Sequence, residues 1–274
     1  MSNSSSLYDI RHGFIPLMVS VPHNGTVIPD DIRETMTEAG QSSRDTDWFL
    51  DRLYDFFEAE NASQITARIS RYVVDLNRST DSVNLYPGQD TPELCPTACF
   101  DRSSIYESGR EPDEAEIQRR VEEYWRPYHD ALQTELERLV DHFGFVVLFD
   151  AHSIASEVPR LFDGRLPDFN FGTNNGKSCT AEFQEHIETF AESINGYSHV
   201  VNGRFVGGHI TRYYGRPEKR VNAVQLELSQ ATYMNELDHT WKSETSEQVQ
   251  GVLRSFFQSL ISWTSQNQTA SKNS

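Results

Sequence analysis

Short apolar runs separated by helical patterns constrain the fold of this chain more than any other feature. FIPLMVSV (14–21) and FVVLF (145–149) have the length and the continuous apolar character of buried strands. Residues 63–77 are rich in β-branched side chains and predict one or two more strands, and VNAVQLELS (221–229) alternates as a strand does. Strands of this kind, spaced by helices along the chain, indicate an α/β protein.

The segments between these runs carry helical periodicity. We expect helices, in chain order, at residues 45–60, 113–143, 180–195 and 243–263. Pro112 suits the first turn of the longest helix, Gly144 ends it, and Pro127 should kink it. Residues 80–110 have many turn formers and little period, and therefore predict a long irregular excursion.

Composition limits the organisation of the chain and its partners. No linker or repeat divides the sequence, so one domain is expected over residues 1–274, with polar, frayed tails at about 1–9 and 265–274. The net charge of −17 argues against nucleic acids and anionic membranes as partners. A small anionic substrate would be repelled by this field and would need a local cluster of arginines. The sequence leaves the oligomeric state open.

The expected cellular compartment follows from the apolar runs, the first residues and the cysteines of the sequence. No apolar run approaches the length of about 18 residues that a transmembrane helix needs. The first residues show no secretory pattern, and three cysteines, an odd number, are typical of reduced thiols. We therefore expect a cytoplasmic protein. Cys95 and Cys99, four residues apart, do not have a zinc-binding spacing.

Two histidines stand directly after predicted strands and suggest a metal site. His23 follows the run at 14–21, and His152 follows the run at 145–149. A hydrolytic zinc ion usually takes three protein ligands from His, Asp and Glu and keeps one position open. Asp47 is the favoured carboxylate, with Asp45 as the alternative. Each residue also has a structural interpretation, because Asp is common in a first helical turn and a lone His is often a buried hydrogen-bonding group.

A carboxylate in a predicted strand could serve as a general base. Glu227 lies between Leu226 and Leu228, so it points away from them, toward either solvent or a polar cavity. In a cavity it could take a proton from water and pass it to a leaving amine. Gln225 shares its face of the strand and could bind substrate. Asp150, beside His152, is expected to orient that histidine, and we assign Ser153 the same supporting position.

Arginines near the strand ends could hold an anion, because a guanidinium binds a carboxylate through two parallel hydrogen bonds. For most of them a solvated surface charge is the alternative. Arg78 is the best candidate, since Asn77 precedes it and a strand-like run leads into it. The further candidates for substrate binding are Arg71, Arg160, Arg165, His209 and Arg212. The Gly207–Gly208 pair predicts a mobile loop that would carry the last two over a substrate.

Three of these motifs resemble zinc carboxypeptidases in their order. VDLNR resembles the Asn-Arg pair that grips a substrate carboxylate, AHS the His-Ser zinc ligand, and LEL the catalytic Glu of a late strand. The first ligand element departs from that family. A ligand Glu is expected three residues after the first ligand His, and Thr26 stands there, so the acidic ligand has to come from elsewhere.

The sequence is more closely similar to the N-formylglutamate amidohydrolase (deformylase) family over roughly residues 10–260. The similar motifs, in order, are VPHNGTVIP, DTDWF, SRYVVDLNR, LYPG, WRPYH, LFDAHSI, VPRLFDGRLPDFNFGT, GGHITRYYG and VNAVQLELSQATYM. The resemblance implies hydrolysis of N-formyl-L-glutamate to formate and L-glutamate, the last step of one route of histidine degradation. It also implies one divalent metal, expected to be Zn²⁺, and a carboxypeptidase-like α/β fold with a mixed central sheet.

Together these interpretations give a residue-level hypothesis. His23, Asp47 and His152 hold the metal, Glu227 is the base, and Asn77 with Arg78 grips one carboxylate of the substrate. A second arginine, from positions 160, 165 or 212, takes the other carboxylate. The alternatives are the same chemistry on another N-acyl acidic amino acid, such as N-formyl- or N-acetyl-aspartate, and a non-catalytic metal-dependent binder of acidic amino acids.

Overall fold

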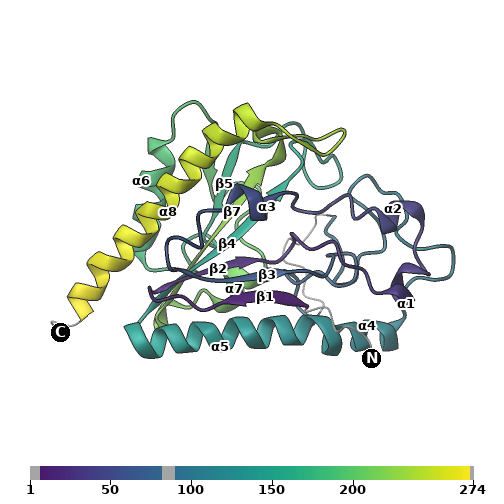
Figure 1. Cartoon of the computed structure of the whole chain (residues 1–274), viewed down its shortest axis with the longest axis horizontal. Helices are drawn as coiled ribbons and strands as arrows, with labels where there is room; N and C mark the ends of the chain where they lie inside the picture. The colour runs from purple at the N-terminus through teal and green to yellow at the C-terminus, as the bar shows by residue number, and fades with distance from the viewer. Residues whose placement is uncertain (1–6, 82–89, 272–274) are drawn as a thin grey trace.

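The computed structural model describes residues 7–81 and 90–271 and has one mixed sheet at its centre (Figure 1). The sheet has seven strands in the order β1-β3-β2-β4-β7-β5-β6. Their bounds are β1 Tyr8–Arg11, β2 Leu17–Val21, β3 Ser63–Ala67, β4 Val146–Ile154, β5 Phe169–Gly172, β6 His199–Val201 and β7 Val221–Ser229. The central strands β3, β2, β4 and β7 are parallel, while β1 and β5 run antiparallel to their neighbours β3 and β7. The predicted α/β class with a mixed sheet is confirmed.

Helices cover both faces of this sheet. The longer ones are α4 Glu114–Arg120, α5 Arg126–Phe143, α6 Ala181–Ser193, α7 His209–Tyr214 and α8 Ser243–Ser271, and the single turns are α1 Asp30–Arg33, α2 Glu38–Gln41 and α3 Leu50–Leu53. Alternate residues of the central strands pack on α6 and α8 on one face and on α5 and α7 on the other. A small ribbon of β8 Met234–Asn235 and β9 Thr240–Trp241 follows β7.

The long helical pattern at 113–143 forms as three consecutive pieces. Asp113 caps α4 by accepting from the backbone N–H of Glu116, which leaves Pro112 just outside the helix. A π-helical segment, Val121–Trp125, joins α4 to α5, whose second residue is Pro127. Proline has no N–H and its ring crowds the preceding turn, and the wider π turn accommodates both effects. Gly144 ends α5 in the left-handed conformation, as expected.

The helix expected at 45–60 is largely absent, and this prediction was wrong. Within that range the structure has a single helical turn, α3, preceded by Phe49 at a left-handed φ of 61°. The backbone N–H of Asp47 donates to the carbonyl of His23, which holds this stretch beside the sheet instead of in a helix. The apolar pattern was still informative, because Leu53, Phe56 and Phe57 are all buried in the core. Tertiary contacts outweighed helical propensity here.

Strand β4 is longer than the apolar run that predicted it. The expected strand ended at residue 149, whereas β4 continues to Ile154 because Asp150 to Ile154 pair with Gln225 to Ser229 of β7. His152 therefore lies within the strand, not after it. The ends also differ from the expected tails: Tyr8–Arg11 pairs with β3, and α8 continues to Ser271. Positions 1–6 and 272–274 lie outside the described residues.

The remaining expectations have mixed outcomes. Strands at 14–21 and 221–229 and helices at 180–195 and 243–263 are present, although the first strand begins only at Leu17 and the last helix extends to Ser271. The range 63–77 contains one strand, β3. In the described part of 80–110 we find isolated bridges and turns but no helix or strand; residues 82–89 lie outside it. Across residues 7–81 and 90–271, no helix combines the length and the apolar character needed to cross a membrane.

His129 of α5 ties the sheet-edge segment that carries Asn77 and Arg78 to the helical layer. Its imidazole Nε2 lies 2.8 Å from the carbonyl of Leu76, and its Nδ1 lies 2.9 Å from the hydroxyl of Tyr214 in α7. The carbonyl can only accept, so Nε2 donates and Nδ1 accepts, which is the neutral tautomer. Burial, with a smaller contribution from nearby His209, lowers the pKa of His129 to about 3.

This buried histidine predicts a specific pH dependence of stability. The unfolded chain protonates His129 near its ordinary pKa of about 6.5, whereas the folded chain does so only near pH 3. The contribution of His129 to the free energy of unfolding is therefore complete above pH 6.5. It is lost as the pH falls below that value, by at most about 1.4 kcal/mol per pH unit. Between pH 6.5 and 4, denaturant unfolding should show a steeper loss of stability in the parent than in His129→Gln.

The control is His199→Gln, which changes an exposed histidine at the edge strand β6. Its stability should follow the parent's slope with pH. Equal slopes for the parent and His129→Gln would contradict the assignment of a buried neutral imidazole.

Candidate metal centre

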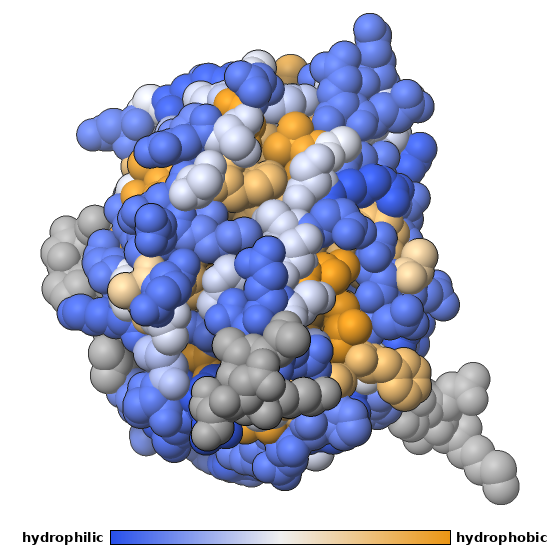
Figure 2. All heavy atoms as spheres, turned by 90° about the vertical axis from the view of Figure 1, so that its left-hand side faces the viewer, coloured by the Kyte–Doolittle hydropathy of each residue, from blue (hydrophilic) through white to orange (hydrophobic). Residues whose placement is uncertain are grey.

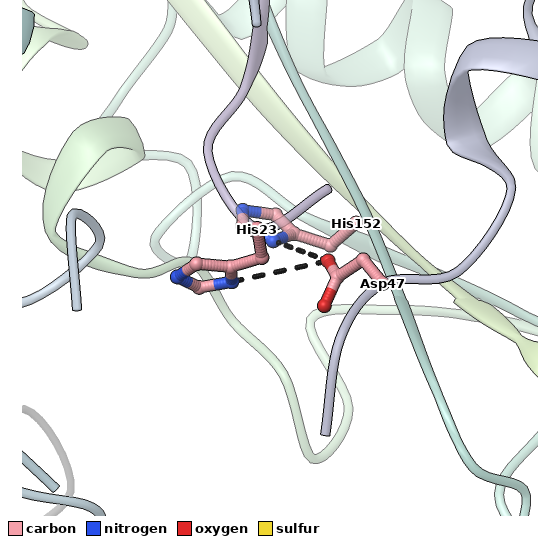
Figure 3. A group of neighbouring side chains, drawn as sticks. All are labelled: His23, Asp47 and His152. Atoms are coloured by element: carbon pink, nitrogen blue, oxygen red, sulfur yellow. Dashed lines mark hydrogen bonds and ion pairs between the residues drawn. The ribbon is translucent and has the colours of Figure 1, made fainter. Parts of the chain in front are cut away.

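Three buried side chains from distant parts of the chain converge at the carboxyl side of the sheet. His23 follows β2, Asp47 precedes α3, and His152 lies in β4; one ligand atom from each falls within 4.8 Å of the others (Figure 3). Asp47 Oδ2 lies 3.1 Å from His152 Nδ1 and 3.8 Å from His23 Nδ1. All three are at most 4% exposed. The structure thus brings together the three residues that the sequence singled out as ligands.

Each histidine has a carboxylate on its far nitrogen. His23 Nε2 lies 2.7 Å from Asp75 Oδ1, and His152 Nε2 lies 3.0 Å from Asp150 Oδ2. When each Nε2 donates to its carboxylate, each Nδ1 keeps a lone pair that faces Asp47. A carboxylate behind a ligand histidine fixes its tautomer and raises its basicity. The arrangement places two Nδ1 atoms and one carboxylate oxygen around a common point.

Asp75 is the functional candidate that sequence reasoning left out of the site. It is 1% exposed, and besides His23 it accepts from Arg71 at 2.9 Å and from the backbone N–H of Asn77 at 2.9 Å. The available signal was an acidic residue between Val74 and Leu76 in an otherwise apolar stretch. That signal does not by itself identify a histidine 52 positions away as its partner.

The pKa shifts follow from burial and from these carboxylates. Burial, together with the charge of Arg71, lowers the pKa of His23, so this imidazole is neutral and able to bind a cation. Burial would also lower the pKa of His152, but Asp150 and Asp47 outweigh it and raise that pKa well above its ordinary value. Burial acts to raise the pKa of Asp75, yet His23 and Arg71 hold it well below the usual range.

The donor set fits a divalent cation. Ligand atoms about 2.1 Å from a tetrahedral ion lie about 3.4 Å apart, which is close to the separations from Asp47 Oδ2 to the two Nδ1 atoms. The charges agree with this geometry. Four buried carboxylates surround the point, from Asp47, Asp75, Asp150 and Glu227. Arg71 pairs with Asp47 and Asp75, and Arg78 lies 4.0 Å from Asp75, so part of this charge is balanced by arginines, while Asp47 Oδ2 stays directed at the two histidines.

Glu227 lies directly opposite His152 in the sheet. The two are register partners in the parallel strands β4 and β7, so their side chains project from the same face. Burial raises the pKa of Glu227 to about 8. Gln225, two residues earlier, lies 3.4 Å from Glu227 Oε2 and accepts from the backbone N–H of Gly208. Of the two directions that the sequence allowed for Glu227, the structure has the one toward a cavity.

A pocket with about 510 Å³ of empty space, its open mouth included, gives access to the two histidines. Its described polar lining includes Arg71, Asn77, Arg78, Gly208, Gln225 and Glu227, and its apolar lining consists of Pro92, Phe100, Ile154, Leu161 and Phe205. Arg78 lies on this wall with its Nε 4.0 Å from Asp75 Oδ2. The pocket therefore combines a cationic, hydrogen-bonding side with an apolar side.

The Asn77 side chain is bound to protein groups. Its Oδ1 accepts from the backbone N–H of Ile210, and its Nδ2 lies 2.9 Å from His152 Nε2 and 3.4 Å from Asp150 Oδ2. A side chain at Gly208 would collide with this amide, since an added Cβ would lie 2.3 Å from Asn77 Nδ2. The Gly208 position, expected to belong to a mobile loop, thus allows α7 to pack closely on Asn77.

Several predicted anion holders lie elsewhere. Arg160 donates to the carbonyls of residues 98 and 99 and to Asp90, and Arg165 lines a separate surface pocket. Arg212 donates to the carbonyl of Gly207, and His209 packs against Tyr213 and Trp125; neither is among the described residues lining the site pocket. The expectation of a second pocket arginine from 160, 165 or 212 is not met among the described lining residues, where Arg71 accompanies Arg78.

Ser153 supports the centre through its backbone. Its N–H donates to Asp47 Oδ2 at 3.0 Å, while its hydroxyl is within 2.8 Å of the Tyr233 hydroxyl and 3.3 Å of Gln230 Nε2. Because Ser153 alternates with His152 along β4, its side chain faces the opposite side of the sheet. The serine thus orients the Asp47 carboxylate without pointing into the pocket.

Comparison with protein families and known proteins gives a consistent result. Residues 15–234 match the model of the family described as N-formylglutamate amidohydrolase. The chain is 45% identical over 254 residues to the N-formylglutamate deformylase of Pseudomonas putida, covering 92% of this chain and 95% of that protein. It is 46% identical to the N-formylglutamate deformylase of Pseudomonas aeruginosa with the same coverage.

Two solved structures share the fold. A crystal structure of N-formylglutamate amidohydrolase from Ralstonia eutropha JMP134 superimposes with a TM-score of 0.77 at 23% identity, covering 97% of this chain and 98% of that one. A gene product of Agrobacterium tumefaciens superimposes with a TM-score of 0.70 at 17% identity, covering 96% of each chain. The α/β architecture is therefore common to more distant proteins.

The centre predicts how metal content responds to substitution. We expect about one divalent ion per purified chain and close to none in His152→Ala, because one of three protein ligands is lost. Asp75→Asn should retain the ion with an affinity roughly 10- to 100-fold weaker, since the group behind His23 changes and no ligand is removed. Metal analysis after dialysis against graded chelator measures both effects.

The matched control is His142→Ala, an exposed histidine in the last turn of α5, which should keep the parent's metal content. Full metal content in a folded His152→Ala protein would disprove the ligand assignment.

Proposed function

The chain belongs to the N-formylglutamate amidohydrolase family, and from that premise we propose that it hydrolyses N-formyl-L-glutamate to formate and L-glutamate. The observation that carries the proposal is the joint placement of a buried cation-binding triad, a carboxylate base and an arginine on one pocket. A protein that only bound acidic amino acids would need no base opposite a metal ligand, so the pairing of Glu227 with His152 favours an enzyme.

His23, Asp47 and His152 would hold the ion. Two imidazoles and a carboxylate are a donor set that Zn²⁺ accepts readily, so zinc is the ion we propose. When bound, such an ion supplies Lewis acidity that polarises the formyl carbonyl and makes a water molecule more acidic. The protein's part is to hold the three ligands rigidly, which Asp75, Asp150 and the backbone N–H of Ser153 do.

Glu227 would act as the general base and then the general acid. Its carboxylate takes a proton from the water that attacks the formyl carbon, and it returns that proton to the departing amine nitrogen of glutamate. Burial raises the pKa of this carboxyl to about 8, which favours the proton-holding form in the second step. A neighbouring cation lowers the pKa and so favours the carboxylate needed in the first step. Gln225, 3.4 Å away, helps to orient the group.

Arg78 would bind a carboxylate of the substrate. It lies on the pocket wall in a protein whose net charge of −17 repels anions, so a local cation is needed for binding. Asn77 fixes the position of this segment because its Oδ1 accepts from the backbone N–H of Ile210 and its Nδ2 donates to Asp150. Arg71 shares the wall and is positioned by Asp75. The geometry supports Arg78 as the principal holder of the anionic end.

The decisive experiment is formate release from N-formyl-L-glutamate with and without a chelator. Turnover should disappear on metal removal and return on addition of Zn²⁺. Glu227→Gln should keep its metal but lose roughly 10²- to 10⁴-fold in kcat, because the amide cannot accept the proton. Turnover by a metal-loaded Glu227→Gln protein at the parent's rate would exclude the base assignment, and no formate release by the parent would exclude the proposed reaction.

Replacement of Arg78 tests the substrate contact. We expect Arg78→Ala to lose at least about tenfold in kcat/KM for N-formyl-L-glutamate, and Arg78→Lys to lose less, because it keeps the charge but not the paired hydrogen bonds. The parent should also prefer N-formylglutamate to N-formylaspartate, a difference of one methylene worth about 1–3 kcal/mol.

Arg165→Ala is the matched control, since Arg165 lines a separate surface pocket and should leave both substrates' kcat/KM unchanged. If Arg78→Ala and Arg165→Ala behave alike, Arg78 does not bind the substrate. A preference of the parent for N-formylaspartate would instead point to the sibling activity.

A further inference from the structure

A second pocket lies behind the apolar wall of the site. It holds about 1310 Å³ of empty space, its mouth included, and its lining includes Trp48, Ala155 and Val158. Among the described residues, Phe100 and Ile154 line both this pocket and the site pocket. These two side chains therefore form a partition between a confined site and a larger space beside it.

Phe100 is positioned by polar groups on both sides of the partition. Its backbone N–H donates to Asp45 Oδ2 at 2.7 Å, and its ring lies 5.1 Å from the guanidinium carbon of Arg71. Arg160 donates to the carbonyls of Ala98 and Cys99, immediately before Phe100. This arrangement gives Arg160 a positioning role in place of the anion contact that the sequence suggested. These contacts place the Phe100 ring between the two pockets.

The partition lies at the end of the pocket away from Gln225 and Asn77, and Arg71 of the cationic side contacts it through the Phe100 ring. Along β4, Asp150, His152 and Ile154 face the same side at intervals of about 7 Å. In the sheet, Gln225 pairs with Asp150, and Glu227 pairs with His152. Gln225 therefore lies on one side of the row formed by His152 and Glu227, and it lies close to Gly208, which packs on Asn77. Ile154 lies on the other side, next to Phe100. A substrate with its carboxylate toward Asn77 and Arg78 thus directs its acyl group toward the partition.

We propose that Phe100, supported by Ile154, restricts the enzyme to formyl substrates by closing the space that a longer acyl chain would occupy. This inference rests on the proposed deformylase function. A formyl group places only hydrogen beyond its carbonyl carbon, whereas acetyl and propionyl groups place carbon atoms there. The wall is a packed aromatic ring, so a longer acyl chain requires displacement of the ring or of the substrate. Removal of the ring connects the site with the second pocket.

The test compares Phe100→Ala with the parent on N-formyl-, N-acetyl- and N-propionyl-L-glutamate, measuring release of L-glutamate. In the parent, kcat/KM should fall steeply with acyl length. In Phe100→Ala, the formyl-to-propionyl ratio of kcat/KM should fall at least tenfold. An unchanged ratio overturns the inference. A parent that releases no formate from N-formylglutamate overturns the proposed function instead, so the two failures are distinguishable.

Three further proteins complete the test. Phe162→Ala removes an aromatic ring from the same apolar cluster without touching either described lining, and should keep the parent's ratio. Phe100→Ala combined with Ala155→Trp refills the second pocket and should restore the parent's ratio. If thermal unfolding shows Phe100→Ala to be unfolded, Phe100→Leu takes its place. Phe100→Ala could instead change the ratio of kcat/KM between N-formylglutamate and N-formylaspartate and leave the formyl-to-propionyl ratio unchanged. That result would place the amino-acid side chain at the partition and overturn the proposal.

Discussion

The contact between Asp47 and the two histidines is the interaction on which the site depends. A buried carboxylate is costly unless it is paired, and Asp47 is 1% exposed. Its oxygens face His23, His152 and Arg71, and the N–H of Ser153 donates to it. These four groups come from three parts of the chain, so satisfying one carboxylate draws together the loop after β2, the segment after residue 67 and strand β4.

The sheet's register then decides which side chain meets this centre. β4 and β7 pair from Val146 with Val221 to Ile154 with Ser229, and this alignment sets Glu227 opposite His152 and Gln225 opposite Asp150. A slip of one residue would turn Glu227 to the opposite face and remove this carboxyl group, the proposed base, from the pocket. The continuous burial of both strands opposes such a slip, because every position of each strand is packed against a neighbour. Reactivity and packing are thus governed by the same pairing.

The view of the molecule in Figure 2, turned by 90° from Figure 1, shows a surface dominated by hydrophilic side chains with small apolar areas between them. The sequence carries a net charge of −17. An anionic substrate meets a repulsive surface and a pocket whose wall carries Arg71 and Arg78. The positive charge at the site is therefore opposite in sign to the net charge of the protein. This contrast favours an anion that fits the pocket over anions that do not.

Sequence periodicity by itself determined the buried strands β2, β4 and β7, the helices α5, α6 and α8, and the residue types of the centre, because apolar spacing and strand-end chemistry are local properties. The tertiary structure decided what depends on distant contacts. It extended β4 through His152, replaced a helix at 45–60 with the turn that holds Asp47, added Asp75 behind His23, and placed Arg160 behind Phe100. Such partners lie tens of residues apart along the chain, and only the folded backbone sets the distance between them.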